Sequence, residues 1–165
     1  MYPWMVYLHV VATFIFLMTH GVSSFVALRL RNQRDPALAR AWMMVYYDNG
    51  LYYTALYGSL LTILVTGVIS AFMGKWWGFG WIWLSLALLI GIIVFMTYMA
   101  ATHYSKVRKA LGMPYLESWK SQPAGDPAPP EEIEALMANS PAITLAVIGF
   151  GGIAIILWLM MFKPF

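Results

Sequence analysis

Two histidines lie on one face of the first apolar segment of the chain. His9 and His20 are eleven residues apart, about three turns and roughly 16 Å along a helix axis. Thr13, Phe16 and Ser23 share their face at spacings of three and four. Imidazoles are costly inside a membrane span and usually face the protein interior. Because the two rings are too far apart to bind one metal ion together, the pattern indicates two separate ligand positions at different depths.

The composition is typical of an integral membrane protein. Of the 165 residues, 61% are hydrophobic and 10% are charged, whereas soluble domains carry roughly 25% charged residues. There is no cysteine, which excludes disulfides, thiolate metal sites and covalent haem attachment through Cys-x-x-Cys-His. The net charge is only +3, and the basic residues lie beside apolar segments, so they indicate membrane orientation and no nucleic-acid binding.

Hydropathy and length predict four membrane-spanning helices in one domain that covers residues 1–165. A helix needs about 20 mostly apolar residues to cross a bilayer. The segments that meet this requirement are 4–28, 51–73, 79–102 and 142–162. The first of them lacks the basic leading region of a signal peptide, so we interpret it as a retained helix. The expected fold is an all-α, antiparallel four-helix bundle.

Lysine and arginine residues predict how this bundle is oriented. The loops 29–50 and 103–141 hold most of the basic residues, and the opposite side holds only Lys75 and Lys163. By the positive-inside rule both loops lie in the cytoplasm and both termini lie outside. The sequence therefore predicts a multi-pass membrane protein.

Short interfacial helices are expected in the cytoplasmic loops. Asp35-Pro36 is a helix-start signal and predicts a helix over 37–47, which Asn49-Gly50 then interrupts. In the second loop, the proline-rich linker 122–130 precedes a short acidic helix that reaches about residue 138.

Turn and cap signals define the ends of the later spans. Ser140-Pro141 is expected to cap the last span. The short turn 74–78 predicts that segments 51–73 and 79–102 form an antiparallel hairpin.

Small residues predict where the spans approach each other closely. The second span carries Ser59, Thr62, Thr66 and Ser70 at helical spacing. The last span carries Gly149, Gly151 and Gly152. Each of these helices is expected to have a packing face of small side chains.

The third histidine, His103, lies at the cytoplasmic end of segment 79–102, and Met96 and Met99 lie on the turns before it. Haem b accepts His/His or His/Met axial pairs, and Cu(I) accepts imidazole and thioether ligands. The candidate haem ligands are therefore His9, His20 and His103, and the candidate copper ligands are His9, His20, Met96 and Met99. The alternatives are histidines hydrogen-bonded in helix packing and, for His103, a solvated residue at headgroup level.

Both ends of the sequence resemble one group of small bacterial membrane proteins. Tyr7-Leu8-His9 begins the first apolar helix, and the final motif is Trp158-Leu159-Met160-Met161-Phe162-Lys163-Pro164. These motifs and the four-span plan resemble the copper-resistance-D-like proteins, the membrane protoporphyrinogen-oxidase-like proteins and a related predicted integral membrane family of unknown function. The resemblance implies that the protein lies in a bacterial inner (plasma) membrane and that His9 binds haem b or copper. No lysine lies within a span, which disfavours the protoporphyrinogen-oxidase-like branch.

Two hypotheses from different classes follow. In the first, the protein binds haem b through the histidines of its first span and moves electrons to or from a quinone or a partner subunit. In the second, it is a cofactor-free accessory subunit of a larger bioenergetic or transport complex, or a homo-oligomer, which its small size and its 8 Trp, 10 Tyr and 9 Phe favour. Copper handling is a third option. No span contains an acidic residue, so a carboxylate proton relay of the kind ion transporters use is not expected.

Overall fold

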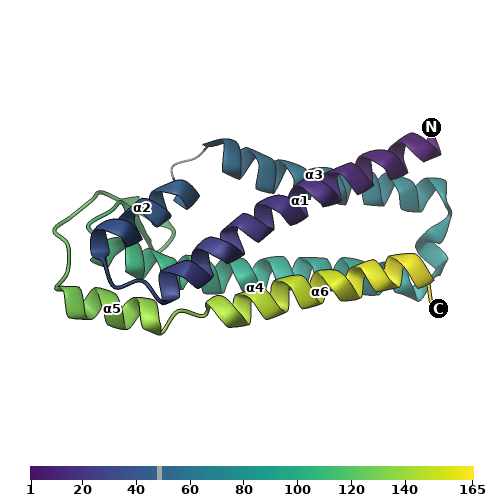
Figure 1. Cartoon of the computed structure of the whole chain (residues 1–165). Coiled ribbons are helices and arrows are strands. Elements are labelled where there is room, and N and C mark those ends of the chain that lie inside the picture. The colour runs from purple at the N-terminus through teal and green to yellow at the C-terminus, as the bar shows by residue number, and fades with distance from the viewer. Residues whose placement is uncertain (48–49) are drawn as a thin grey trace.

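The computed structural model describes residues 1–47 and 50–165. Four of its helices are long and apolar enough to cross a membrane, which confirms the predicted four-helix multi-pass architecture (Figure 1). These are α1 (Tyr2–Arg31), α3 (Gly50–Met73), α4 (Gly80–Ala110) and α6 (Ala142–Phe162). α4 continues well beyond the apolar part of its sequence, so its last turns carry Lys109 and the buried Arg108.

Five shorter elements connect the long helices. They are α2 (Pro36–Tyr47), the 3-10 turn η1 (Trp76–Gly78), β1 (Tyr115–Glu117), β2 (Lys120–Gln122) and α5 (Pro130–Ala138). The two strands pair antiparallel as a small hairpin in which Tyr115 lies opposite Gln122. This hairpin was not expected from the sequence, because strands of three residues are too short to show a period-two pattern.

Local signals in the sequence explain where the short helices begin. The Asp35 side chain accepts a hydrogen bond from the backbone N–H of Ala37 at 2.8 Å, as the capping signal predicts. α5 begins at Pro130 with two glutamates in its first turn, also as predicted. The predicted break at Asn49 lies outside the described residues. Ser140 does not cap α6: its hydroxyl lies 3.1 Å from the hydroxyl of Tyr104, and Pro141 occupies the cap position without a side-chain hydrogen bond.

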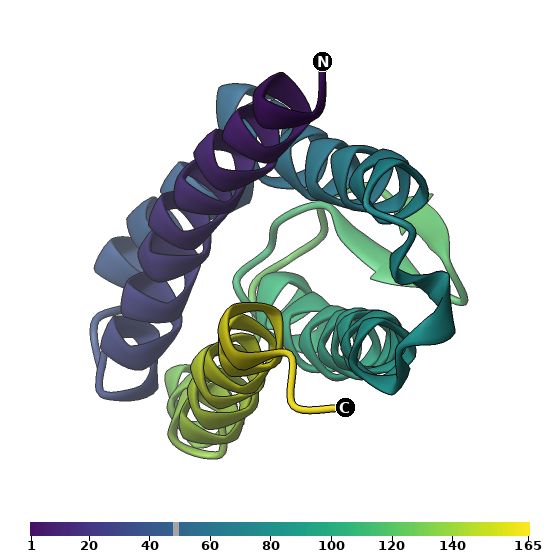
Figure 2. The ribbon, with the colours of Figure 1, turned by 90° about the vertical axis from the view of Figure 1, so that its right-hand side faces the viewer.

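The four long helices form two pairs. α1 packs along α3, α4 packs along α6, and a smaller contact between α1 and α6 joins the pairs (Figure 2). α3 and α4 run antiparallel on either side of η1, as expected for segments 51–73 and 79–102, but they diverge, because α3 packs against α1 and α4 packs against α6 (Figure 1). On α3 the small residues Ser59, Thr66 and Ser70 are buried. Small residues let helices approach closely, and the helix that α3 packs against is α1 and not α4.

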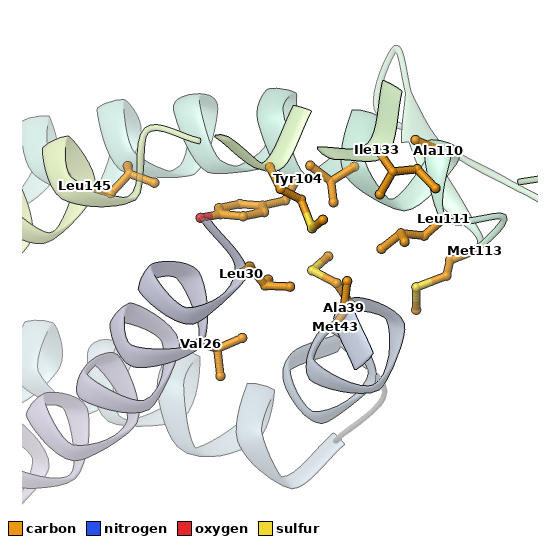
Figure 3. Packing of buried hydrophobic residues seen from close by; sticks show 12 residues of the cluster. Val26, Leu30, Ala39, Met43, Tyr104, Ala110, Leu111, Met113, Ile133 and Leu145 are labelled. Atoms are coloured by element: carbon orange, nitrogen blue, oxygen red, sulfur yellow. The ribbon is translucent and has the colours of Figure 1, made fainter. Parts of the chain in front are cut away.

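The two ends of the bundle are different. Both termini and η1 lie at one end, here called the terminal end, and α2, the hairpin and α5 lie at the other, the capped end (Figure 1). At the capped end α1, α2, α4 and α5 contribute to one buried cluster, shown in Figure 3. Leu30, Met43, Val107 and Met137 are among its most completely buried members. At the terminal end the Lys163 ammonium group lies 4.5 Å from the ring centroid of Trp76.

Candidate functional site

His9 lies in the seam between α1 and α3. Its Nδ1 is 3.0 Å from the hydroxyl oxygen of Thr66, and that hydroxyl donates its own hydrogen to the backbone carbonyl of Thr62. The Thr66 oxygen is therefore free to accept, and Nδ1 of His9 carries the proton. The ring covers Gly67, where a Cβ atom would lie 3.2 Å from His9 Cε1. His9 is thus a hydrogen-bonded packing residue of the α1–α3 pair.

His20 lies about three turns further along α1, where α1 meets α6 and α4. It is 8% exposed, Phe16 stacks on its ring with centroids 5.6 Å apart, and Phe150 of α6 meets it edge-on at 5.2 Å. Its Nε2 is buried and has no hydrogen-bond partner among the described residues. Leaving a buried polar atom without a hydrogen bond costs roughly 1–3 kcal/mol of folding free energy. His20 differs in this respect from His9, whose Nδ1 has a partner.

Gly149 of α6 brings His20 close to Met96 of α4. A Cβ atom at Gly149 would lie 2.5 Å from His20 Nε2 and 3.1 Å from Met96 Cε. The structure therefore brings together one candidate imidazole ligand and one candidate thioether ligand. Gly152 is also a close-packing position, because a Cβ atom there would collide with Ile92, whereas Gly151 has nothing within 4 Å.

The remaining candidate ligands lie elsewhere. Met99 packs against the buried cluster of the capped end. His103 meets Tyr104 edge-on with centroids 5.1 Å apart, and its buried Nε2 has no hydrogen-bond partner in the described part of the chain. The three histidines thus occupy three separate environments. Within residues 1–47 and 50–165, no group of three or more His, Cys, Asp or Glu side chains is placed to hold a metal ion.

A cavity of about 390 Å³ lies between the two helix pairs. Small-molecule sites have volumes of roughly 300–1,000 Å³. The cavity is lined from all four long helices, by α1 from Phe16 to Leu30, α3 from Tyr53 to Leu60, α4 from Leu89 to Ser105 and α6 from Ala142 to Ile156. The hairpin adds Leu116 and Trp119. His20 and Met96 belong to the lining, and His9, Met99 and His103 do not.

The shape and chemistry of the cavity restrict what it can hold. Its lining follows α4 from Leu89 to Ser105, which is about 24 Å of helix rise. The cavity is therefore elongated along the bundle, a shape that suits a ligand with a long chain. Among residues 1–47 and 50–165, no Lys, Arg, Asp or Glu lines the cavity. Its hydroxyl groups are partly used within the protein, since Ser23 donates to the carbonyl of His20.

Sequence reasoning missed the α3 wall of this cavity. Tyr53, Leu56, Tyr57 and Leu60 follow the i, i+3, i+4, i+7 spacing of one helix face, and all four line the cavity. That spacing was readable in the sequence. In a span that is apolar on every side, however, nothing distinguishes a cavity face from a lipid face.

Comparison of the chain with family models, with curated proteins and with solved structures gave no match. The resemblance carried by the two terminal motifs stays a prediction.

Proposed function

We propose that this protein holds a lipid-soluble molecule with a long apolar chain inside its helix bundle. The observation that carries the proposal is an elongated cavity lined by four helices that can each span a membrane, with no charged side chain among the described residues that line it. Apolar side chains from both helix pairs, such as Leu30, Leu60 and Ile153, would contact the chain. Burying an apolar chain gains about 0.8 kcal/mol per CH₂ relative to water, but the surrounding bilayer offers similar burial. Selectivity must therefore come from shape.

The proposed setting is a bacterial inner membrane with the capped end in the cytoplasm. Arg29, Arg31, Arg34 and Arg40 and the basic residues of the 103–141 loop belong to this end, and the positive-inside rule favours it for the cytoplasm. The cavity lies beside the capped half of α1 and of α6. Its ligand would accordingly come from the cytoplasmic leaflet.

Filling the cavity tests the proposal. Ala146→Phe places a bulky ring on a residue that lines the cavity, and Val147→Phe places the same ring on a neighbour that is 66% exposed. With protein in nanodiscs and labelled decyl-benzoquinone or palmitate as probes, Ala146→Phe is expected to weaken binding by about tenfold or more. Val147→Phe should bind like the unmodified chain. Equal binding by both variants would contradict the proposal.

A metal centre at His20 and Met96 is the second candidate function. His20 Nε2 and the thioether methyl group of Met96 both lie close to the position that a Cβ atom would take at Gly149, and this proximity favours a metal centre. Even a Cβ atom at Gly149 would collide with His20 Nε2, so a porphyrin ring does not fit between His20 and α6 in this arrangement. A single Cu(I) ion suits a donor set of imidazole and thioether.

Spectra and metal analysis test this second candidate and the haem expectation separately. Copper that co-purifies with the chain and is lost in both His20→Ala and Met96→Leu, but kept in His9→Ala, would support the copper site. A b-type α band in the dithionite-reduced minus oxidised spectrum would establish haem b and membrane electron transfer. Protein from haem-replete, copper-supplemented cells with neither signal would contradict both.

A further inference from the structure

Aromatic side chains of α3 and of the β1–β2 hairpin, Tyr53, Tyr57 and Trp119, line the cavity at the capped end, and this part of the cavity is here called its mouth. α3 and α4 diverge there, and the β1–β2 hairpin lies between them (Figure 2). On α3 the rings of Tyr53 and Tyr57 are stacked, with centroids 5.9 Å apart and an angle of 3° between the ring planes. Trp119, at the tip of the hairpin, also lines the cavity although its side chain is 68% exposed.

The backbone at the hairpin tip is strained. Ser118 and Trp119 both have positive φ angles, 50° and 64°, as a two-residue hairpin turn of type I′ requires. Such turns favour Asn-Gly, and a bulky residue in this conformation is an outlier that costs of order 1–3 kcal/mol. A strained residue at this position is therefore the first place to look for a ligand contact.

The rest of the hairpin is held firmly against α4. The Ser105 hydroxyl donates to the carbonyl of Leu116 and accepts from its N–H. Lys109 pairs with Glu117 at 3.7 Å and lies 5.0 Å from the ring centroid of Tyr115. These contacts fix the position of the tip, but they leave most of the Trp119 ring uncovered. Packing within the chain thus does not account for a strained tryptophan at the tip.

We infer that the ligand of the cavity carries an uncharged, flat ring, as a quinone does, and that this ring stacks on Trp119 at the mouth. The inference rests on the proposed function and names the class of ligand. No charged side chain of the described residues lines the cavity, which disfavours a phosphate or carboxylate head, and aromatic faces favour a planar ring. The tail then runs along the cavity toward Gly149.

Binding measured on two probes tests the inference. The unmodified chain in nanodiscs should bind decyl-benzoquinone more tightly than palmitate, which has a chain but a carboxylate head. Trp119→Leu should weaken quinone binding roughly fivefold and leave palmitate binding unchanged. Trp119→Phe should keep most of the quinone affinity. Trp158→Leu is the matched control, because Trp158 is also half exposed and lies outside the lining.

A second variant separates a binding role from a structural one. Ser118→Asn with Trp119→Gly supplies the preferred type I′ turn, so the melting temperature should stay the same or rise while quinone binding weakens at least as much as in Trp119→Leu. A lower melting temperature with unchanged quinone binding would overturn the inference. If Trp119→Leu binds both probes like the unmodified chain while Ala146→Phe loses both, the inference fails and the proposed function stands. If the unmodified chain binds neither probe, both fail.

Discussion

The two histidines of α1 share a helix face but lie in halves of the bundle that are packed differently. In the terminal half, His9 is hydrogen-bonded to Thr66 and seated on Gly67. In the capped half, His20 has an Nε2 without a partner in the described structure and borders a cavity. A polar residue within a span can thus stabilise helix pairing or line a ligand-binding site, and the residues on neighbouring helices determine which of these roles it has.

The largest effect is expected at Gly149. Gly149→Ala puts a Cβ 2.5 Å from His20 Nε2, so α6 must move or His20 must turn, and overpacking of this kind costs about 1–3 kcal/mol. Gly151→Ala is the control, since nothing lies within 4 Å of that position. Reversible unfolding in mild detergent measures the difference. Combining Gly149→Ala with His20→Ala should restore most of the lost stability, and failure to do so would show that the collision is with something other than His20.

The two histidines should respond in opposite ways to the same substitution. His9→Leu leaves Thr66 without its partner in the seam and should lower the free energy of unfolding by about 1 kcal/mol. His20→Leu removes an unpartnered buried nitrogen and should leave stability unchanged or raise it by up to about 1 kcal/mol. Unfolding of both variants under one condition checks this. Equal losses for both would erase the distinction between the two halves.

The smallest effect is expected at the surface of the capped end. Arg34 and Glu134 pair at 3.2 Å between the loop after α1 and α5, but their side chains are 85% and 51% exposed. Exposed pairs contribute about 0.2–1 kcal/mol and are screened by salt. Arg34→Gln should therefore change the unfolding midpoint little, and less at high salt than at low salt. A large, salt-independent loss of stability would mean that this ion pair holds α5 in place at the capped end.

Much of the helical plan was predictable because it depends on local sequence. Length and apolarity gave the four spans, Asp35-Pro36 gave the start of α2, and Pro130 with its glutamates gave α5. The pairing of α1 with α3 and of α4 with α6 was not predictable, because nearly every face of these helices is apolar and several carry small residues.

The candidate site was predictable only as a set of residue types. The spacing of His9 and His20 predicts that they share one face of α1, but which helix covers each histidine depends on how the helices cross. Met96 was a candidate partner, yet its approach to His20 depends on Gly149 of a third helix. The cavity and Trp119 depend on the divergence of α3 from α4, which no local signal encodes.

The most direct test of a chain-binding cavity is mass spectrometry of the lipid-soluble molecules that remain bound to the purified protein in mild detergent. We expect one class of chain-bearing molecule in stoichiometric amount. The Val147→Phe variant should retain it, and the Ala146→Phe variant should lose it. Purified protein with no retained molecule, or with the same mixed membrane lipids in both variants, would contradict the proposal of a chain-binding cavity.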